Sequence, residues 1–290
     1  MYDNYRVIVC TPAGRKEYLS ILLRYILANL WIVDEWHLWF NTTKTSDVEY
    51  INELEQKYPF VSIIRCCNPA IDPQGREVIE SWATEHQTKF YLLPNDSDTI
   101  YIKMDDDIVF VASDCIKNLV DCKIRTPQKY VVSANVINNA ICTYILQSMA
   151  KVLPTNFGKV DFGVGDPIGW EDPIFAEDLH DYFLNHIDDL EQFKTIDFDL
   201  FNFAQISINC ICWMGKDHDK FFEPLVETYP SHEQFITTER ASQLGQGTLV
   251  CGTAIVSHFA FWPQRPYLLT TNILDRYVSL ADKVLGKEEK

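Results

Sequence analysis

The sequence lacks an apolar run long enough to cross a lipid bilayer. Its longest apolar stretch, Tyr18–Val33, contains Arg24 and Asn29, whereas a spanning helix needs about 20 mainly apolar residues. The start of the chain also lacks a signal-peptide pattern, because Met1 is followed almost at once by a strand-like run. We therefore expect a cytoplasmic protein with no membrane span in this chain.

Positive charge is scarce as well. The 290 residues include 25 lysines and arginines against 41 aspartates and glutamates, so the net charge is −16. Such a surface repels phosphate backbones and anionic lipid headgroups, and we expect no nucleic-acid partner. A substrate that carries phosphate would need a local reversal of sign, which a bound cation supplies.

The nine cysteines show no zinc-site spacing. Cys66 and Cys67 are adjacent, and Cys210 and Cys212 are separated by one residue, and neither arrangement matches a zinc motif. Others, such as Cys10 and Cys251, come at the end of apolar strand-like runs. We interpret these cysteines as buried, reduced thiols.

The remaining pattern is that of a large folded domain, since 47% of the residues are hydrophobic and no repeat or low-complexity linker divides the chain. Period-two and period-3.6 patterns alternate along it. The expected strands are Tyr5–Cys10, Trp36–Phe40, Phe60–Cys66, Thr99–Met104, Lys129–Ala134, Ile206–Trp213 and Leu249–His258. The expected helices are Leu19–Leu30, Val48–Tyr58, Arg76–Lys89 and Ser231–Leu244. This order predicts an α/β, Rossmann-like fold with a mostly parallel central sheet flanked by helices, and Leu153–Asp199 as a substrate-facing insertion.

Three consecutive aspartates, Asp105, Asp106 and Asp107, follow the expected strand Thr99–Met104. Ligands of open α/β sheets bind at the carboxyl ends of strands. Because side chains alternate along an extended chain, Asp105 and Asp107 face one way and Asp106 the other. Two carboxylates on one side favour a hard divalent cation that also binds phosphate oxygen. The alternative is a solvated acidic turn, whereas the spacing excludes an EF-hand loop.

Four segments in order, VIVCTPAGRKEYLSILL, IYIKMDDDIVF, HEQF and CGTAIVSHF, resemble the pattern of GT-A glycosyltransferases over residues 5–262. The resemblance implies a GT-A fold in one domain over 1–290, with a nucleotide-sugar-binding half (1–135), an acceptor-binding half (136–265) and a C-terminal helix or tail (266–290). It implies transfer of a sugar from a nucleoside-diphosphate sugar, commonly a UDP-sugar, to a saccharide hydroxyl, with Mn²⁺ or Mg²⁺.

The resemblance also assigns residues. Asp107 is the chief metal ligand, Asp105 lies near the ribose or on the metal, and His258 is a further ligand whose nitrogen favours manganese. The nucleotide would contact Thr11, Pro12, Ala13, Arg15, Asn41, Asp105 and Asp106. Free N–H groups at a helix start and the Arg15 fork suit phosphate, although Thr11 and Pro12 could simply begin the helix.

Glu233 occupies the position of the general base in inverting family members, and Asp217 is a reserve for that role. Glu233 equally suits the first turn of a helix. The segment Asp166–Phe183 contains Trp170, Phe175, Tyr182 and Phe183, which either stack on an acceptor sugar or anchor a loop.

Two other functions stay open. Asp105–Val109 also resembles the motif of haloacid-dehalogenase-type phosphohydrolases, in which Asp105 would be the nucleophile. That motif normally ends the first strand of its fold, whereas three strand-like units come first here. The other alternative is a non-catalytic sugar-binding module.

Overall fold

The computed structural model describes residues 1–65, 70–71, 77–78, 90–91, 93–200, 202–218 and 232–286. Its strands are β1 (Arg6–Ala13), β2 (Glu35–Phe40), β3 (Val61–Ile64), β4 (Ala70–Ile71), β5 (Glu77–Val78), β6 (Thr99–Met104), β7 (Ile108–Val111), β8 (Val132–Ile137), β9 (Phe198–Asp199), β10 (Cys210–Met214) and β11 (Leu249–His258). The expected helix Arg76–Lys89 lies outside the described residues except at Glu77–Val78, which is strand.

The helices are of α, π and 3₁₀ type. The α-helices are α1 (Lys16–Ala28), α2 (Thr45–Lys57), α4 (Cys115–Arg125), α5 (Ala140–Tyr144), α6 (Pro173–Asn185), α8 (His232–Gln234), α9 (Ala241–Leu244), α10 (Arg265–Leu268) and α11 (Ile273–Leu285). The π-helices are η1 (Ile145–Met149), η2 (Pro167–Glu171) and η5 (Phe235–Arg240), and the 3₁₀-helices are η3 (Ile187–Phe193) and η4 (Gly215–Asp217). No helix in these parts of the chain is long and apolar enough to cross a membrane.

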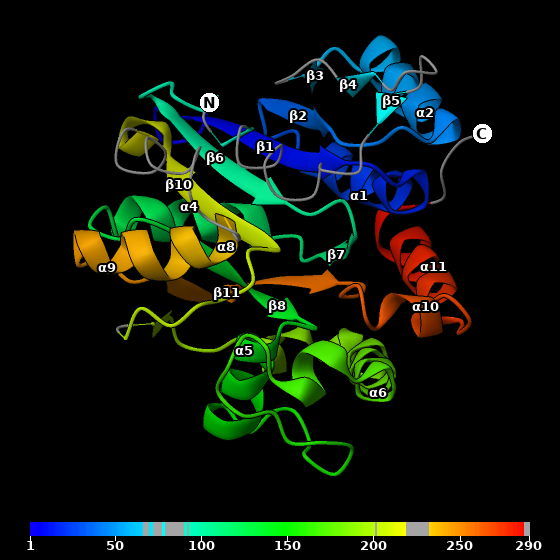
Figure 1. Ribbon diagram of the computed structural model, residues 1–290, viewed down its shortest axis with the longest axis vertical. Coiled ribbons are helices and arrows are strands. Elements are labelled where there is room, and N and C mark those ends of the chain that lie inside the picture. The colour runs from blue at the N-terminus through cyan, green and yellow to red at the C-terminus, as the bar shows by residue number, and fades with distance from the viewer. Residues whose placement is uncertain are drawn as a thin grey trace.

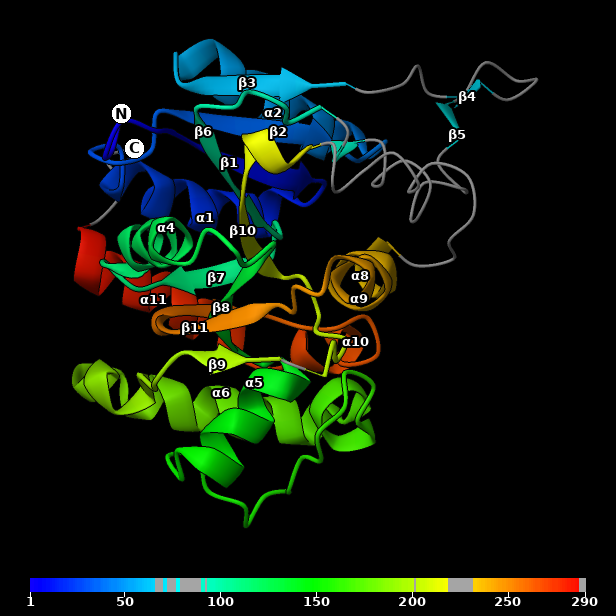
Figure 2. The same cartoon turned by 90° about the vertical axis from the view of Figure 1, so that its left-hand side faces the viewer.

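The central sheet has nine strands in the order β3-β2-β1-β6-β10-β8-β11-β7, with β9 paired to β11 (Figure 1). Strands β1, β2, β3, β6, β8 and β11 run in one direction, and β7, β9 and β10 run against it. Helices lie on its faces, as Figure 2 shows for α1 and α4. The expected α/β fold with a mostly parallel central sheet is confirmed.

Side chains of β1 alternate between two apolar cores. Val7 and Val9 belong to the larger core, together with buried residues of α1, α4 and α11, whereas Ile8 and Cys10 belong to the smaller core on the opposite face. The smaller core is largely aromatic, and the rings of Tyr101 and Trp213 stack there at 5.8 Å. With both faces covered, the sheet offers mainly its edges to ligands.

The expected insertion contains a regular helix. Asp172 caps α6 by accepting hydrogen bonds from the amides of Ile174 and Phe175, and Pro173 occupies the first turn. Phe175 and Phe183 are fully buried in the larger core. These two aromatic residues therefore anchor the segment to the body of the protein.

The start of α1 differs from expectation. Thr11 and Pro12 do not begin the helix, because β1 stays extended to Ala13 through its pairing with β2, and α1 starts at Lys16. Thr11 is buried, and its hydroxyl accepts a hydrogen bond from the Trp36 indole at 2.9 Å.

Candidate functional site

Four strands bring polar residues to one edge of the sheet. Arg15 follows β1, the aspartate triplet follows β6, and His258 ends β11, while Asn209 precedes β10, which runs in the opposite direction. A pocket of about 370 Å³ opens at this edge. Its charged or titratable lining residues are Arg15, Lys103, Asp105, Asp107, His232, Glu233, His258 and Arg265.

Asp107 is buried, and nitrogen atoms of three side chains lie near one of its carboxylate oxygens. Its Oδ2 lies 2.8 Å from an Arg265 nitrogen, 3.2 Å from an Arg15 nitrogen and 3.5 Å from His258 Nε2. Burial raises the pKa of this carboxyl, but Arg15, His258 and Arg265 outweigh burial and hold the pKa well below its usual value. Asp107 is therefore ionised at every physiological pH.

The ring of His258 is oriented by the carbonyl of Asn138, 3.2 Å from Nδ1. A carbonyl only accepts, so Nδ1 carries the proton of this bond. With a proton on Nδ1, Nε2 is the nitrogen that carries the lone pair of the neutral ring, and this is the tautomer that a metal ligand at this position requires.

Asp105 is held from two sides. Lys103 Nζ donates to Oδ1 of Asp105 and to the carbonyl of Ile208 at 2.7 Å. The Asn209 amide donates to Oδ2 of Asp105 at 3.2 Å. Lys103 is almost fully buried, so these bonds place a fixed positive charge at the base of the pocket.

Asp106 faces away from the pocket, although the triplet lies in the turn between β6 and β7 and not in an extended strand. Its carboxylate accepts hydrogen bonds from the Gly14 amide at 3.1 Å and from Nε of Arg15 at 3.0 Å. Burial raises its pKa, and Arg15 offsets part of that rise. A side chain at Gly14 would meet the Asn41 carbonyl at 2.6 Å, so glycine is needed for this turn. Asp106 thus positions Arg15 and does not line the pocket.

The ligand atoms of Asp105, Asp107 and His258 lie within 4.8 Å of one another. Two carboxylates and one imidazole form a donor set that suits Mn²⁺ and also Mg²⁺. The donors therefore fit a divalent cation in chemistry and in spacing, with the guanidinium groups of Arg15 and Arg265 beside them.

Glu233 lines the same pocket. Its carboxylate accepts hydrogen bonds from the Gln205 amide at 2.9 Å and from the Ile208 backbone N–H at 3.2 Å. Burial raises the pKa of Glu233, partly offset by these two hydrogen bonds and by Lys103. Its neighbour His232 is also desolvated, which lowers its pKa to about 3 and keeps it neutral.

The other residues expected in the site lie elsewhere. Thr11, Pro12 and Ala13 belong to β1, and neither they nor Asn41 lines the pocket among the described residues. Asp217 follows β10, and this antiparallel strand takes it to the opposite edge of the sheet, where it lies 3.9 Å from Lys123 Nζ. The reserve role of Asp217 as a base is therefore incompatible with this site.

Sequence patterns did not reveal several lining residues. Lys103 and His232 lie within segments that carry the family resemblance but receive no role from it, and Asn209 and Trp262 belong to no motif. Trp262 is 70% exposed. Its ring packs edge to face against the ring of Trp170, with the ring centroids 5.8 Å apart, and both residues line the pocket. Of the four expected aromatic residues, only Trp170 lines it among the described residues.

No protein-family model matches this chain, and a search of curated proteins finds no match. A solved 4-diphosphocytidyl-2C-methyl-D-erythritol synthase from Anaerococcus prevotii is similar with 11% identity over 95% of this chain and 96% of that one, at a TM-score of 0.45. A second structure of a synthase with this name has 10% identity over 91% and 96% of the chains, at a TM-score of 0.41. A CMP:2-keto-3-deoxy-manno-octonic acid synthetase complexed with CTP has 11% identity over 96% and 100%, at a TM-score of 0.45.

The names of these proteins are those of cytidine-nucleotide synthases and not of glycosyltransferases. The expected transfer of a sugar to a saccharide hydroxyl, with Glu233 as the base, is wrong on this comparison. The two alternatives, a phosphohydrolase that uses Asp105 and a sugar-binding module, find no support either. In particular, Asp105 follows β6 and not the first strand of the sheet.

Proposed function

We propose that this chain is a divalent-cation-dependent nucleotidyltransferase. An oxygen of an anionic acceptor attacks the α-phosphorus of a nucleoside triphosphate, the bond from that phosphorus to the bridging oxygen breaks, and pyrophosphate leaves. The observation that carries the proposal is the convergence of Asp105, Asp107 and His258, within 4.8 Å of one another, in a pocket that contains three cationic side chains.

The positive groups of the pocket support a polyphosphate substrate. Arg15, Lys103 and Arg265 line it although the protein as a whole carries a net charge of −16. Guanidinium groups bind phosphate oxygens through paired, charge-assisted hydrogen bonds. Arg15 and Arg265 now both contact Oδ2 of Asp107. In the proposed complex they exchange this oxygen for phosphate oxygens.

Asp105, Asp107 and His258 would hold the cation. When bound, it would draw negative charge from the phosphates, which lowers the barrier to departure of pyrophosphate. Lys103 keeps Asp105 oriented from below through its own hydrogen bond, and Asn138 keeps Nε2 of His258 directed into the site.

An anionic acceptor suits the remaining groups. A phosphate or carboxylate oxygen is already deprotonated at neutral pH and needs no general base. Glu233 accepts hydrogen bonds from the Gln205 side chain and the Ile208 backbone. Its proposed role is therefore to position the segment that leads into β10. The exposed Trp262 and its neighbour Trp170 offer aromatic faces on which a nucleobase can stack.

The test is a thermal-shift panel of CTP, UTP, GTP and ATP, each with and without Mn²⁺ or Mg²⁺, followed by measurement of pyrophosphate release with sugar phosphates and sugar acids as acceptors. CTP comes first because one of the similar structures is a complex with CTP. A ligand at 100 times its Kd stabilises the native state by about 2.7 kcal/mol. We expect a cation-dependent shift with at least one triphosphate, and pyrophosphate release with one acceptor class.

Asp107→Asn is the matched variant, because it preserves shape and removes the charge. It should abolish the cation-dependent part of the shift, while Asp188→Asn, at an exposed ion pair with Lys283, should leave it unchanged. If no triphosphate stabilises the protein in the presence of either cation, the proposal is wrong.

A further inference from the structure

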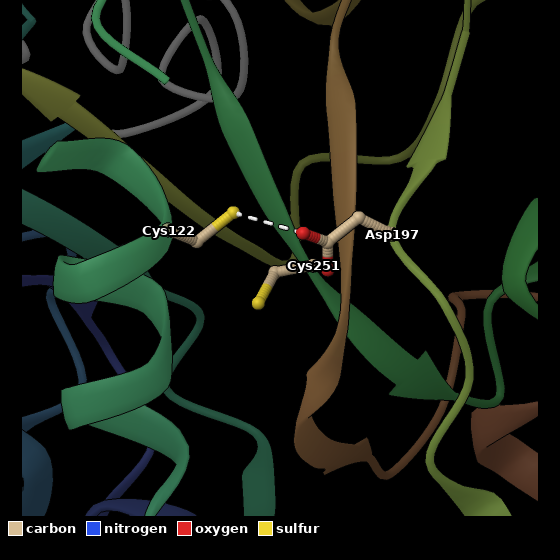
Figure 3. Close-up of side chains that lie close together, drawn as sticks. All are labelled: Cys122, Asp197 and Cys251. Carbon is tan, nitrogen blue, oxygen red and sulfur yellow. Dashed lines mark hydrogen bonds between the residues drawn. The ribbon is translucent and has the colours of Figure 1, made fainter. Parts of the chain in front are cut away.

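A second group of metal-ligand side chains lies far from the pocket. Cys122 in α4, Asp197 before β9 and Cys251 in β11 lie close together (Figure 3). Their sulfur and oxygen atoms lie within 4.8 Å of one another, and Cys122 Sγ is 3.8 Å from Oδ2 of Asp197. Both thiols are buried, whereas the Asp197 side chain is 31% exposed. The cluster therefore has a closed interior and one open side.

The backbone holds Asp197 against β11. The amide of Gly252 donates to Oδ1 of Asp197 at 3.1 Å, and the amide of Thr195 donates to the Gly252 carbonyl at 3.0 Å. A side chain at Gly252 would meet the Thr195 carbonyl oxygen at 2.3 Å. Glycine thus permits a backbone approach that fixes the carboxylate beside Cys251, the preceding residue.

The charges of the cluster suit a divalent cation. Two thiolates and one carboxylate carry three negative charges, and a divalent ion leaves one of them unbalanced. Arg125 lies 3.0 Å from Oδ2 of Asp197 and supplies the remaining positive charge. Its guanidinium contacts the carboxylate as an outer-shell partner of a metal ligand does.

We propose that Cys122, Cys251 and Asp197 form a zinc site. Thiolate sulfurs about 2.3 Å from a tetrahedral zinc lie about 3.8 Å from each other, so the observed cluster closes on the ion with movements of about 1 Å. Water from the open side completes four ligands. Both thiol protons pass to solvent on binding, and the ion joins α4 to β11 and to the segment before β9.

The test uses Cd²⁺ alone, added to reduced and chelator-treated full-length protein, because thiolate–cadmium bonds give an ultraviolet charge-transfer band that carboxylates do not. One equivalent should produce the band and raise the Tm, and zinc should displace cadmium at the same stoichiometry. Both effects should disappear in Cys122→Ser and in Cys251→Ser. In Asp197→Asn, which retains the buried thiols, cadmium should bind at least 10-fold more weakly.

Cys142→Ser and Asp107→Asn are the controls. Cys142 is buried, and its thiol donates only to the Ala134 carbonyl among the described contacts, while Asp107 belongs to the other candidate site. Both variants should keep the cadmium band. Absence of the band at one equivalent, its survival in Cys122→Ser, or a Cys122–Cys251 disulfide found by peptide mapping of the unreduced protein would each overturn the proposal.

Discussion

The Arg265 guanidinium donates a hydrogen bond to Oδ2 of Asp107 over 2.8 Å, across 158 positions of the sequence. This bond joins α10 to the turn after β6. Its acceptor, Oδ2, is one of the two Asp107 oxygens on which the proposed cation could bind. In the proposed complex, Arg265 would therefore compete with the cation when the nucleotide is absent and contact phosphate when it is present.

Arg265→Gln should consequently change two affinities in opposite directions. Without the guanidinium, Mn²⁺ alone should bind about 3- to 10-fold more tightly, because a competing charge has gone. The nucleotide should bind the metal-loaded protein about 10-fold more weakly, since a charge-assisted hydrogen bond is lost. Calorimetric titration measures both. Arg276→Gln, which removes an ion pair with Asp181 elsewhere, is the control, and a parallel fall of both affinities would contradict the exchange.

Trp262→Ala tests the nucleobase contact. Stacking of a base on an aromatic ring contributes about 1–3 kcal/mol, so the Kd for the triphosphate should rise by about 10-fold or more. The Tm should stay nearly constant, because the ring is 70% exposed. Trp31→Ala is the matched control, being 59% exposed at a site where its ring contacts Tyr2. An unchanged Kd in Trp262→Ala would place the base elsewhere.

Sequence patterns indicated the core of the site because its residues follow strands. Asp105 and Asp107 come after β6 and His258 ends β11, and the carboxyl ends of parallel strands share one edge. The metal-binding role of these residues stays a prediction. The antiparallel direction of β10 is not visible in local periodicity, so the sequence does not reveal that Asp217 lies at the edge opposite Asp105.

Other features depend on contacts that no local pattern encodes. Helix α6 was missed because aromatic and acidic residues obscure its periodicity, although its Asp172–Pro173 start is a recognisable cap. Cys122 and Cys251 lie far apart in the sequence, so their spacing resembles no metal motif, and only the packing of α4 on β11 brings them together. The charged side chain of Lys103 points into the protein from a strand. Its burial is explained by its hydrogen bonds to Asp105 and to the Ile208 carbonyl, which the sequence does not show.

Gly215→Ala should destabilise the fold at the edge opposite the pocket. A Cβ atom there would lie 2.0 Å from the carbonyl oxygen of Asp96, so the backbone of one segment has to move, at a cost of about 3 kcal/mol. Gly163→Ala is the control, because no atom of the described residues beyond its chain neighbours lies within 4 Å of the added Cβ, and its effect should stay within about 0.5 kcal/mol. Urea unfolding measures the stability of both variants. Equal stability would contradict the prediction, because it would mean that the backbone near Asp96 moves away from the added Cβ at no cost.

The stability of the protein should fall as the pH drops below about 6.5, in part because of His180. The ring is fully buried, with Nε2 donating to the Phe259 carbonyl at 2.8 Å and Nδ1 accepting from the Tyr277 hydroxyl at 2.8 Å. Burial lowers the pKa of His180 to about 4. Since the unfolded chain has a pKa of about 6.5, it binds more protons between these values, and stability rises with pH across that window.

The contribution of His180 is thus complete above about pH 6.5 and is lost as the pH falls through 4. The shift corresponds to about 3 kcal/mol in total, of which about 2 kcal/mol should be lost between pH 7.5 and pH 5. His180→Gln should be less stable than the wild type at pH 7.5, yet should lose about 2 kcal/mol less on acidification. Burial also lowers the pKa of His232 to about 3. His232 therefore contributes to the dependence of stability on pH in the wild type and in His180→Gln alike. His186→Gln, at an exposed ring, should keep the wild-type slope, and a slope unchanged by His180→Gln would mean that His180 titrates normally in the folded protein.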